Sequence, residues 1–364
     1  MVGFKRAFKG LRDPRAANAQ HELLEVLFIA LAATLCGAQG AVDMARFGQA
    51  KEGLLRGVLR LEHGIPSHDT FSRLFRVLDP QGFERQFQRF MAAFAQANRL
   101  SLKGVVAIDG KSLRHAYERG KSATPLHLVN AFAAEARLAL ASRKAPNRNE
   151  TAAALEVLSM LCLQGSIVTA DALFCSRSFA GRVLERGGDY VLALKGNQSK
   201  LLNAAGRRLA RSGPRSSAKT QEANHDRREW RRATVIRDKS LAEDFPGVTA
   251  LAKITSKRRV GSGKAEPVFT RFYLLSKYLT ATKLLAVVRS HWAIENQLHW
   301  MLDVAFNEDG DRTRKDNAPE NLAILRKLAL NILRAHPAKF SIRQKIKSAG
   351  WDDTFLLSLL GHMQ

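Results

Sequence analysis

Apolar side chains recur at helical spacing through the first hundred residues. Leucines between residues 23 and 35 repeat with the period of 3.6 residues that places them on one helix face. A second helix is predicted over 67–78, ended by Asp79-Pro80. Residues 1–100 are therefore expected to form an all-helical N-terminal domain. The 67–78 helix has the size and basic edge of a helix that enters a DNA groove, although an ordinary amphipathic helix has the same pattern.

Short β-branched runs alternate with helical patterns from residue 103 onward. Strands that alternate with helices are typical of a layered α/β core. We therefore predict a mixed α/β fold whose three-layer core is discontinuous in sequence, comprising residues 101–199 and 282–340. The predicted strands are 105–109, 127–133, 136–141, 166–171 and 190–195, and the predicted helices are 151–163, 176–186, 282–304 and 319–333.

Residues 200–281 interrupt this alternation. They begin with a basic stretch rich in serine and glycine, and strand-like segments follow at 233–237, 248–255 and 267–276. We expect a basic, β-rich insertion between the two parts of the core. Residues 341–364 are expected to be a C-terminal tail.

The charge of the chain narrows the classes of function. Its 364 residues carry 58 Lys and Arg against 33 Asp and Glu, a formal net charge of +25. Such a surplus favours a polyanionic partner, and nucleic acid fits better than a membrane because no basic amphipathic tail is separable from the globular pattern. The longest apolar run, 26–36, is about half of what a membrane span needs. We therefore expect no membrane partner and a bacterial cytoplasmic location at the nucleoid.

Cysteine content and overall composition exclude other classes. A hydrophobic fraction of 46% and a charged fraction of 25% are ordinary for globular domains, so a wholly disordered chain is excluded. The three cysteines form no C-x-x-C pair. A disulfide framework or a four-thiolate zinc site is therefore not expected.

Three carboxylates carry the candidate chemistry. Asp109 and Asp171 each end a predicted strand, where open α/β sheets place their ligands. On the 282–304 helix, Glu295 falls on a stripe of mainly apolar positions, where an unpaired carboxylate is costly to bury. Together the three could hold two Mg²⁺ ions, or Mn²⁺ instead, because these ions prefer oxygen ligands. Two such ions clamp the attacking and leaving oxygens of a phosphoryl transfer.

The chain resembles the insertion-sequence transposases of the ISAs type, also called H-repeat-associated proteins, over nearly its whole length. The resemblance implies an RNase H-like DDE core in which Asp109, Asp171 and Glu295 bind the metal ions. It implies DNA as the partner, both terminal inverted repeats and target DNA, and a homodimer or larger synaptic complex. The matching stretches are Gly64-Ile-Pro-Ser-His-Asp-Thr-Phe71, Ile108-Asp-Gly-Lys-Ser-Leu-Arg114, Asn149-Glu-Thr-Ala152, Val168-Thr-Ala-Asp-Ala172, Gly188-Asp-Tyr-Val-Leu-Ala-Leu-Lys-Gly-Asn-Gln198, His291-Trp-Ala-Ile-Glu-Asn-Gln-Leu-His-Trp-Met-Leu-Asp303 and Phe306-Asn-Glu-Asp309.

One signature of related transposases is absent. They carry a Tyr, an Arg and a Lys around the catalytic Glu, and this chain has Val288, His291 and Leu302 at those positions. Whether strand ends pass through a hairpin, as in some relatives, is therefore open.

Seven further residues are candidates for DNA contact. Those with a cationic or amide side chain suit phosphate contacts, although a solvated surface role is the alternative. The tryptophans suit stacking on an unpaired base, although aromatic residues at helical spacing are more often part of a core. A zinc site from the two histidines that flank Glu295 is not favoured, since the His-Glu-x-x-His order is missing. The candidates are Lys111, Arg114, Lys195, Asn197, His291, Trp292 and Trp300.

The function predicted from these features is that of a DNA transposase, which cuts the ends of an insertion sequence and joins the 3′-hydroxyl to target DNA. Two alternatives share the core. One is an RNase H-like nuclease that does not transpose, and the other is a catalytically silent, transposase-derived DNA-binding protein.

Overall fold

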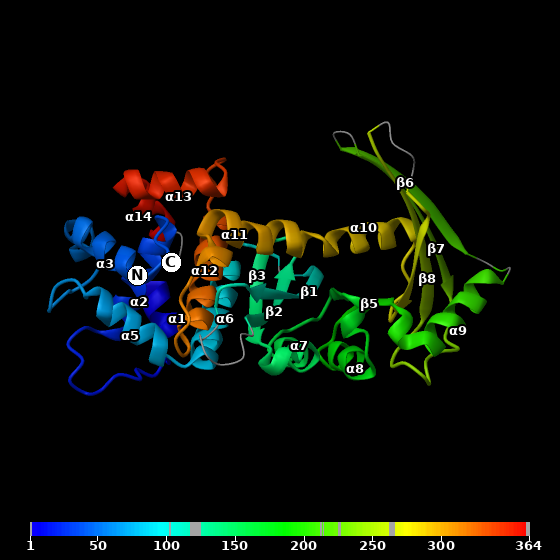
Figure 1. The fold of residues 1–364 in the computed structure, drawn as a ribbon, viewed down its shortest axis with the longest axis horizontal. Helices are drawn as coiled ribbons and strands as arrows, with labels where there is room; N and C mark the ends of the chain where they lie inside the picture. Colours follow the sequence, from blue (N-terminus) through cyan, green and yellow to red (C-terminus); the bar gives the residue numbers. More distant parts are fainter. Residues whose placement is uncertain are drawn as a thin grey trace.

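A computed structural model describes residues 2–101, 103–116, 125–211, 213, 215–224, 227–261 and 266–361. Figure 1 shows three regions side by side along the long axis: a helical bundle, a sheet flanked by helices, and a ribbon of long strands. Helices and strands alternate through the middle region, so the predicted mixed α/β class is confirmed.

The strands of the described residues form one nine-stranded sheet. Its strands are β1 (Gly104–Leu113), β2 (Leu126–Ala133), β3 (Leu138–Lys144), β4 (Ser166–Ala170), β5 (Asp189–Leu194), β6 (Ser216–Asn224), β7 (Arg227–Arg237), β8 (Ala250–Val260) and β9 (Phe269–Leu275). The order across the sheet is β3-β2-β1-β4-β5-β9-β8-β7-β6. The first three strands are antiparallel to one another, and β1, β4 and β5 run parallel. The 3-2-1-4-5 half is the core sheet, formed by residues 104–194.

Helices cover both faces of this sheet, because its strands bury apolar side chains on each side. Helices α7 (Glu150–Ser159), α8 (Arg177–Glu185) and α9 (Ser199–Ala210) share a core with one face. Helix α10 (Ala281–His291) packs on the other face. Helix α11 (Trp300–Phe306) continues the line of α10 towards the helical bundle (Figure 1).

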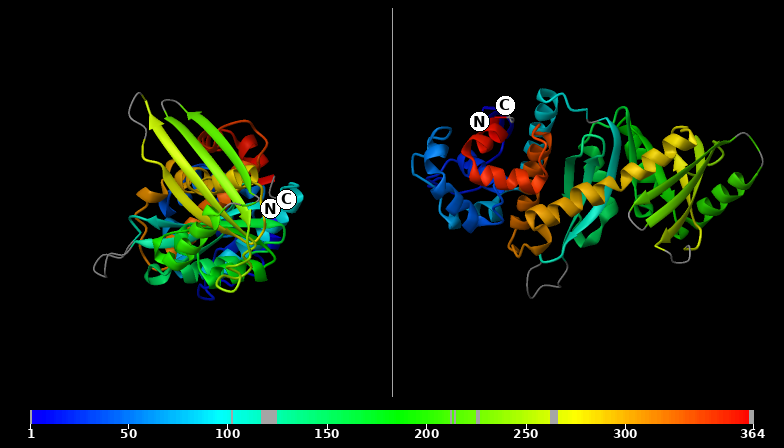
Figure 2. Two further views of the ribbon diagram at one scale, coloured as in Figure 1. Left: turned by 90° about the vertical axis from the view of Figure 1, so that its right-hand side faces the viewer. Right: turned by 90° about the horizontal axis from the view of Figure 1, so that it is seen from above.

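The 200–281 segment extends the core sheet, with β9 pairing antiparallel to β5. Figure 2 shows β6, β7 and β8 projecting past the body as a twisted ribbon. Helix α9 and strand β6 were not predicted from the sequence. Strand β6 is almost entirely polar, so it lacks the alternation of apolar and polar residues that marks a half-buried strand.

The helical bundle is built around α12 (Ala318–Ala335), which is buried on nearly every side, polar residues such as Arg326, Lys327 and Asn331 included. Helix α12 contacts α2, α5, α6 and β3, so the N-terminal helices share one core with the end of the chain. The bundle helices from the N-terminus are α1 (Val2–Phe8), α2 (Leu23–Leu35), α3 (Ala41–Ala50), α4 (Glu52–Arg56), α5 (His68–Val77) and α6 (Pro80–Ala97). In the described part of the chain, no helix has the length and apolarity needed to cross a bilayer.

The expected C-terminal tail is wrong: residues 341–364 contain helices α13 (Ile342–Trp351) and α14 (Asp353–Gly361). Ser341 and Gln344 form a capping box that starts α13. Leu356, Leu359 and Leu360 are buried against the bundle. The segment is ordered by this burial, which the sequence analysis did not take into account.

Side chains of the bundle protect the free edge of β3, the outermost strand of the core. Asn331 of α12 accepts a hydrogen bond from the backbone N–H of Ala139 at 2.9 Å and donates to its carbonyl at 2.8 Å. Glu84 of α6 accepts from the N–H of Ser142 at 2.8 Å. Unpaired backbone groups at an exposed strand edge can pair with another chain. These side-chain bonds give the backbone groups of β3 partners and attach the strand to the bundle.

The burial of Glu84 makes stability depend on pH. Burial raises the pKa of Glu84 from 4.5 to about 7. Between these values the carboxyl is protonated only in the folded state, so the free energy of unfolding falls as pH rises. Relative to that of the Glu84→Gln variant, the free energy of unfolding of the wild type should fall by up to about 3 kcal/mol between pH 4.5 and 8. Urea unfolding at several pH values measures this difference.

Glu185→Gln, at an exposed carboxylate paired with Arg182, is the matched control and should leave the pH profile parallel to that of the wild type. Parallel profiles for Glu84→Gln and the wild type would contradict the prediction.

Candidate active site

Two neighbouring parallel strands bring Asp109 and Asp171 together. Ile108 of β1 lies opposite Ala170 of β4; Asp109 is the next residue of β1, and Asp171 directly follows the end of β4. Adjacent strands lie about 4.8 Å apart, so the two carboxylates start from neighbouring points on one sheet edge. Asp109 is mostly buried and Asp171 is largely exposed.

Glu295 lies above them on the helix that spans the sheet. The predicted 282–304 helix is continuous in direction but contains a π-helical turn, η4 (Ile294–His299), between α10 and α11. Such turns occur often at functional sites. The expectation that Glu295 is on the buried stripe is wrong: Ile294 and Leu298 are buried, and Glu295 is exposed. Its side chain lines a groove of about 1210 Å³ between this helix and the β6–β9 part of the sheet.

The charges of neighbouring carboxylates affect the pKa of Asp109 and of Glu295. Burial raises the pKa of Asp109 to about 7, and the charges of Asp171 and Glu295 add to this rise. Desolvation and the charge of Asp171 also raise the pKa of Glu295. A cation bound near Asp109 and Glu295 would relieve this repulsion.

The carboxylates are not gathered into a finished metal site. Among the residues that the structure describes, no group of three or more His, Cys, Asp or Glu side chains is arranged to hold a metal ion. The chemistry of the donors nonetheless fits Mg²⁺ or Mn²⁺, because all three are hard carboxylate oxygens. Completing such a site requires side-chain movement, which the exposure of Asp171 and Glu295 permits.

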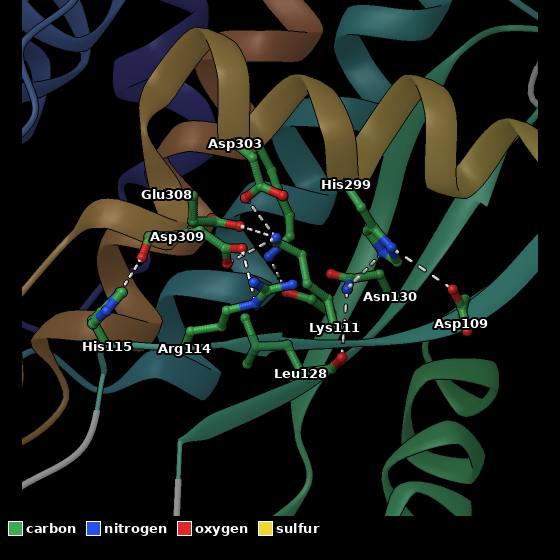
Figure 3. A network of polar contacts seen from close by, with 12 residues as sticks. Asp109, Lys111, Arg114, His115, Leu128, Asn130, His299, Asp303, Glu308 and Asp309 are labelled. Atoms are coloured by element: carbon green, nitrogen blue, oxygen red, sulfur yellow. Dashed lines mark hydrogen bonds and ion pairs between the residues drawn. The ribbon is translucent and has the colours of Figure 1, made fainter.

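Two histidines flank Glu295 on this helix, and each faces one aspartate. His291 Nε2 is 3.9 Å from Asp171 Oδ1, and its Nδ1 is 3.1 Å from the Thr169 hydroxyl. His299 Nδ1 is 3.7 Å from Asp109 Oδ2 (Figure 3). Burial lowers the pKa of both, that of His299 to about 3, so neutral imidazoles face the carboxyls. The sequence showed their spacing, but only as an incomplete zinc motif.

The surroundings of Gly110 explain why the Asp-Gly-Lys motif has a glycine at its second position. A Cβ atom at this position would lie 2.5 Å from His127 Nε2 and 2.7 Å from Glu150 Oε2, so any other residue would force these two side chains to move. His127 and Glu150 are themselves 3.1 Å apart, and Glu150 adds to the negative charge at Asp109. The sequence analysis gave neither of them a role, although Glu150 is part of the Asn149-Glu-Thr-Ala152 match.

Lys111 is not placed to contact a phosphate, and this corrects its predicted role. Its side chain is only 8% exposed, and its Nζ is 2.6 Å from Asp303 Oδ1, 3.3 Å from Asp309 Oδ1 and 3.9 Å from Glu308 Oε2 (Figure 3). The cluster joins β1 to α11 and to the turn that follows it. Lys111 therefore fixes the strand that carries Asp109 against the helix that carries Glu295.

The remaining candidates lie at the surface around the site. Arg114 is 78% exposed and forms an ion pair with Asp309 at 3.4 Å. Lys195 and Asn197 are exposed just beyond the end of β5. Trp292 lines the groove at 41% exposure, and Trp300 is 57% exposed. Their DNA contacts stay predictions. His291 points instead towards Thr169 and Asp171.

Similar proteins of Escherichia coli K12 cover nearly the whole chain. YbfL is 34% identical over 358 residues, which are 95% of this chain and 94% of YbfL. The "H repeat-associated putative transposase YhhI" is 33% identical over 355 residues, 94% of this chain and 93% of YhhI. A solved synaptic complex of the piggyBac transposase with hairpin DNA has a TM-score of 0.44 at 12% identity, covering 99% of this chain and 81% of that one.

Two family profiles also match. "DDE_Tnp_1-associated" matches residues 5–91, and "Transposase DDE domain" matches residues 100–332, well over half of the chain. The second match contains Asp109, Asp171 and Glu295. The resemblance drawn from the sequence is thereby confirmed. The chain belongs to the DDE transposase family, among the relatives of the H-repeat-associated proteins.

Proposed function

We propose that this protein is an insertion-sequence transposase that cuts DNA at the ends of its element and joins the 3′-hydroxyl to target DNA. The proposal is supported by the position of Asp109 and Asp171 at the ends of two adjacent parallel strands, and of Glu295 on the helix that crosses them, where its side chain lines an open groove. A carboxylate triad beside a groove suits hydrolysis and transfer of a phosphodiester.

Asp109, Asp171 and Glu295 would together hold two divalent ions. Bound Mg²⁺ or Mn²⁺ supplies charge neutralisation at the phosphate and lowers the pKa of the attacking water. The buried position of Asp109 keeps it in one place, while Asp171 and Glu295 are free to rotate towards it. The neutral imidazoles of His299 and His291, 3.7 Å from Asp109 and 3.9 Å from Asp171, would limit the positions that the two aspartates can take.

DNA would reach the triad through the groove. Trp292 lies on its wall beside Glu295 and suits stacking on a base at a distorted strand end. Arg114, Lys195, Asn197 and Trp300 supply exposed contacts nearby. The bundle, with α5 as its candidate groove-binding helix, and the basic β-rich segment would bind the terminal inverted repeats. Because two ends are cut together, we infer a homodimer or a larger synaptic complex as the working form.

The test uses a supercoiled plasmid that carries the DNA flanking the gene, incubated with the full chain with and without Mg²⁺. We expect strand-specific cuts at the element's ends and joined products, both requiring the metal ion. Cuts at the ends without any joined product would favour the non-transposing nuclease. Binding without cutting in Mg²⁺ or Mn²⁺ would identify a catalytically silent DNA-binding protein.

A further inference from the structure

The two faces of the β6–β9 sheet differ in their charge. We call the face towards α10 the inner face and the opposite face, on which α9 packs, the outer face; Figure 1 shows α9 and α10 on opposite sides of these strands. Successive side chains of a strand alternate between the two faces. The side chains of residues adjacent in sequence therefore lie on opposite faces of the sheet.

Arginines of the inner face are paired with carboxylates. Arg231 Nη2 is 2.8 Å from Glu229 Oε1, and its Nη1 is 3.9 Å from Glu222. Arg258 Nε is 3.7 Å from Glu266, and Arg289 of α10 pairs with Glu222 across the groove. The positive charge of this face is thus largely compensated within the protein.

The outer face carries cations without compensation. Its positions on β6, β7 and β8 include no acidic residue, and none of its exposed cations forms an ion pair with a described residue. Two pairs of like charge even lie directly opposite each other: Lys219 faces Arg232, and Arg228 faces Arg259. The exposed cations of this face are Lys219, Arg228, Arg232, Lys257 and Arg259.

Uncompensated cations in register do not stabilise this sheet. Like charges directly opposite each other on neighbouring strands are destabilising. The basic surface also continues onto α9, whose Ala205 and Leu209 are buried while Arg207, Arg208 and Arg211 are exposed. A sheet that retains such a surface at a cost to folding is suited to a polyanion that neutralises it.

We propose that the outer face of the β6–β9 sheet is a binding surface for the phosphate backbone of double-stranded DNA. The inner face and the groove are left for DNA that approaches the carboxylates. Trp230, half-buried between Gln221 and Lys257 on the outer face, adds an apolar surface among the cations. The inference rests on the proposed function only in taking DNA as the polyanion.

The test compares two double variants. Each substituted residue of one variant is the sequence neighbour of a substituted residue of the other, on the opposite face of the same strand. Arg232→Gln with Lys257→Gln removes two charges from the outer face, and Arg231→Gln with Arg258→Gln removes two from the inner face. Binding of the full chain to a 40-base-pair duplex is measured in EDTA, where no cleavage occurs, at salt concentrations from 0.05 to 0.3 M.

Loss of two phosphate contacts should reduce the slope of log K against log salt by about 1.8 and weaken binding by roughly 10- to 60-fold at 0.1 M salt. The inner-face variant should reduce the slope and the affinity by less, because its arginines are already paired with glutamates. If the outer-face double variant does not fold, as judged by circular dichroism, Arg232→Gln alone should reduce the slope by about 0.9.

An equal loss of affinity for the duplex in the two double variants, or a larger loss of affinity in the inner-face variant, would overturn the proposal. So would a wild type that binds vesicles of anionic lipid but not the duplex, a result that would also reject the proposed function. Strong wild-type binding to the duplex with no loss in the outer-face variant would reject this surface alone.

Discussion

Replacing Asp109 with asparagine is expected to lower metal-dependent nicking of the flanking DNA at least about 1000-fold, equivalent to about 4 kcal/mol of transition-state stabilisation. Asparagine has nearly the same shape but lacks the negative charge that a divalent ion requires. Asp109 is the most buried of the three carboxylates, so water cannot readily replace its oxygen. Gel analysis of nicked and supercoiled plasmid measures the rate.

Binding separates this effect from misfolding. The Asp109→Asn protein should bind duplex DNA in EDTA as tightly as the wild type, because removing the carboxylate leaves every phosphate contact in place. Asp244→Asn, at an exposed carboxylate outside the site, should nick normally. If Asp109→Asn retained metal-dependent nicking within tenfold of the wild type, the assignment of the triad would fail.

Replacing Lys111 with methionine is expected to cost about 3–5 kcal/mol of folding free energy. Methionine fills similar space, but the three surrounding carboxylates lose their cation. Glu308 is 2% exposed, and its burial already raises its pKa. Without Lys111 that pKa should rise further, so the destabilisation should be larger at pH 8 than at pH 5. Urea unfolding at the two pH values measures both effects.

Arg114→Met is the matched control, because Arg114 shares the partner Asp309 but is 78% exposed. An exposed ion pair contributes at most about 1 kcal/mol, so this variant should unfold almost as the wild type does. A Lys111→Met protein as stable as Arg114→Met would show that the buried cluster is dispensable. It would also remove the reason for assigning Lys111 to positioning β1.

Much of the core could be predicted from local pattern. The runs that became β1, β4 and β5 are short and β-branched, and Asp109 and Asp171 lie where strands of an α/β sheet present ligands. Polar strands such as β6 carry no such pattern, and helices α13 and α14, each buried along one face, were not predicted. The pairing of β9 with β5 also depends on residues about 80 positions apart, which no local period encodes.

Side-chain roles near the site were harder to predict than the triad itself. Lys111 follows Asp109 by two residues and has the chemistry of a phosphate ligand. Its partner Asp303 lies 192 residues further along the chain, so only the folded structure shows that its charge is already used. The same holds for His299, whose spacing from Glu295 was visible but whose contact with Asp109 was not.

The sequence by itself determined the fold class, the excess of positive charge and the three acidic residues whose motifs identify the family. These depend on composition, on local period and on short contiguous motifs, all of which are written along the chain. The tertiary structure alone decided which cations are compensated and which are free. Arg231 and Arg232 are adjacent in sequence, yet the first is paired with glutamates and the second lies opposite Lys219. The reason is physical: alternation of a strand sends neighbours to opposite faces, and only the packed sheet fixes what each face meets.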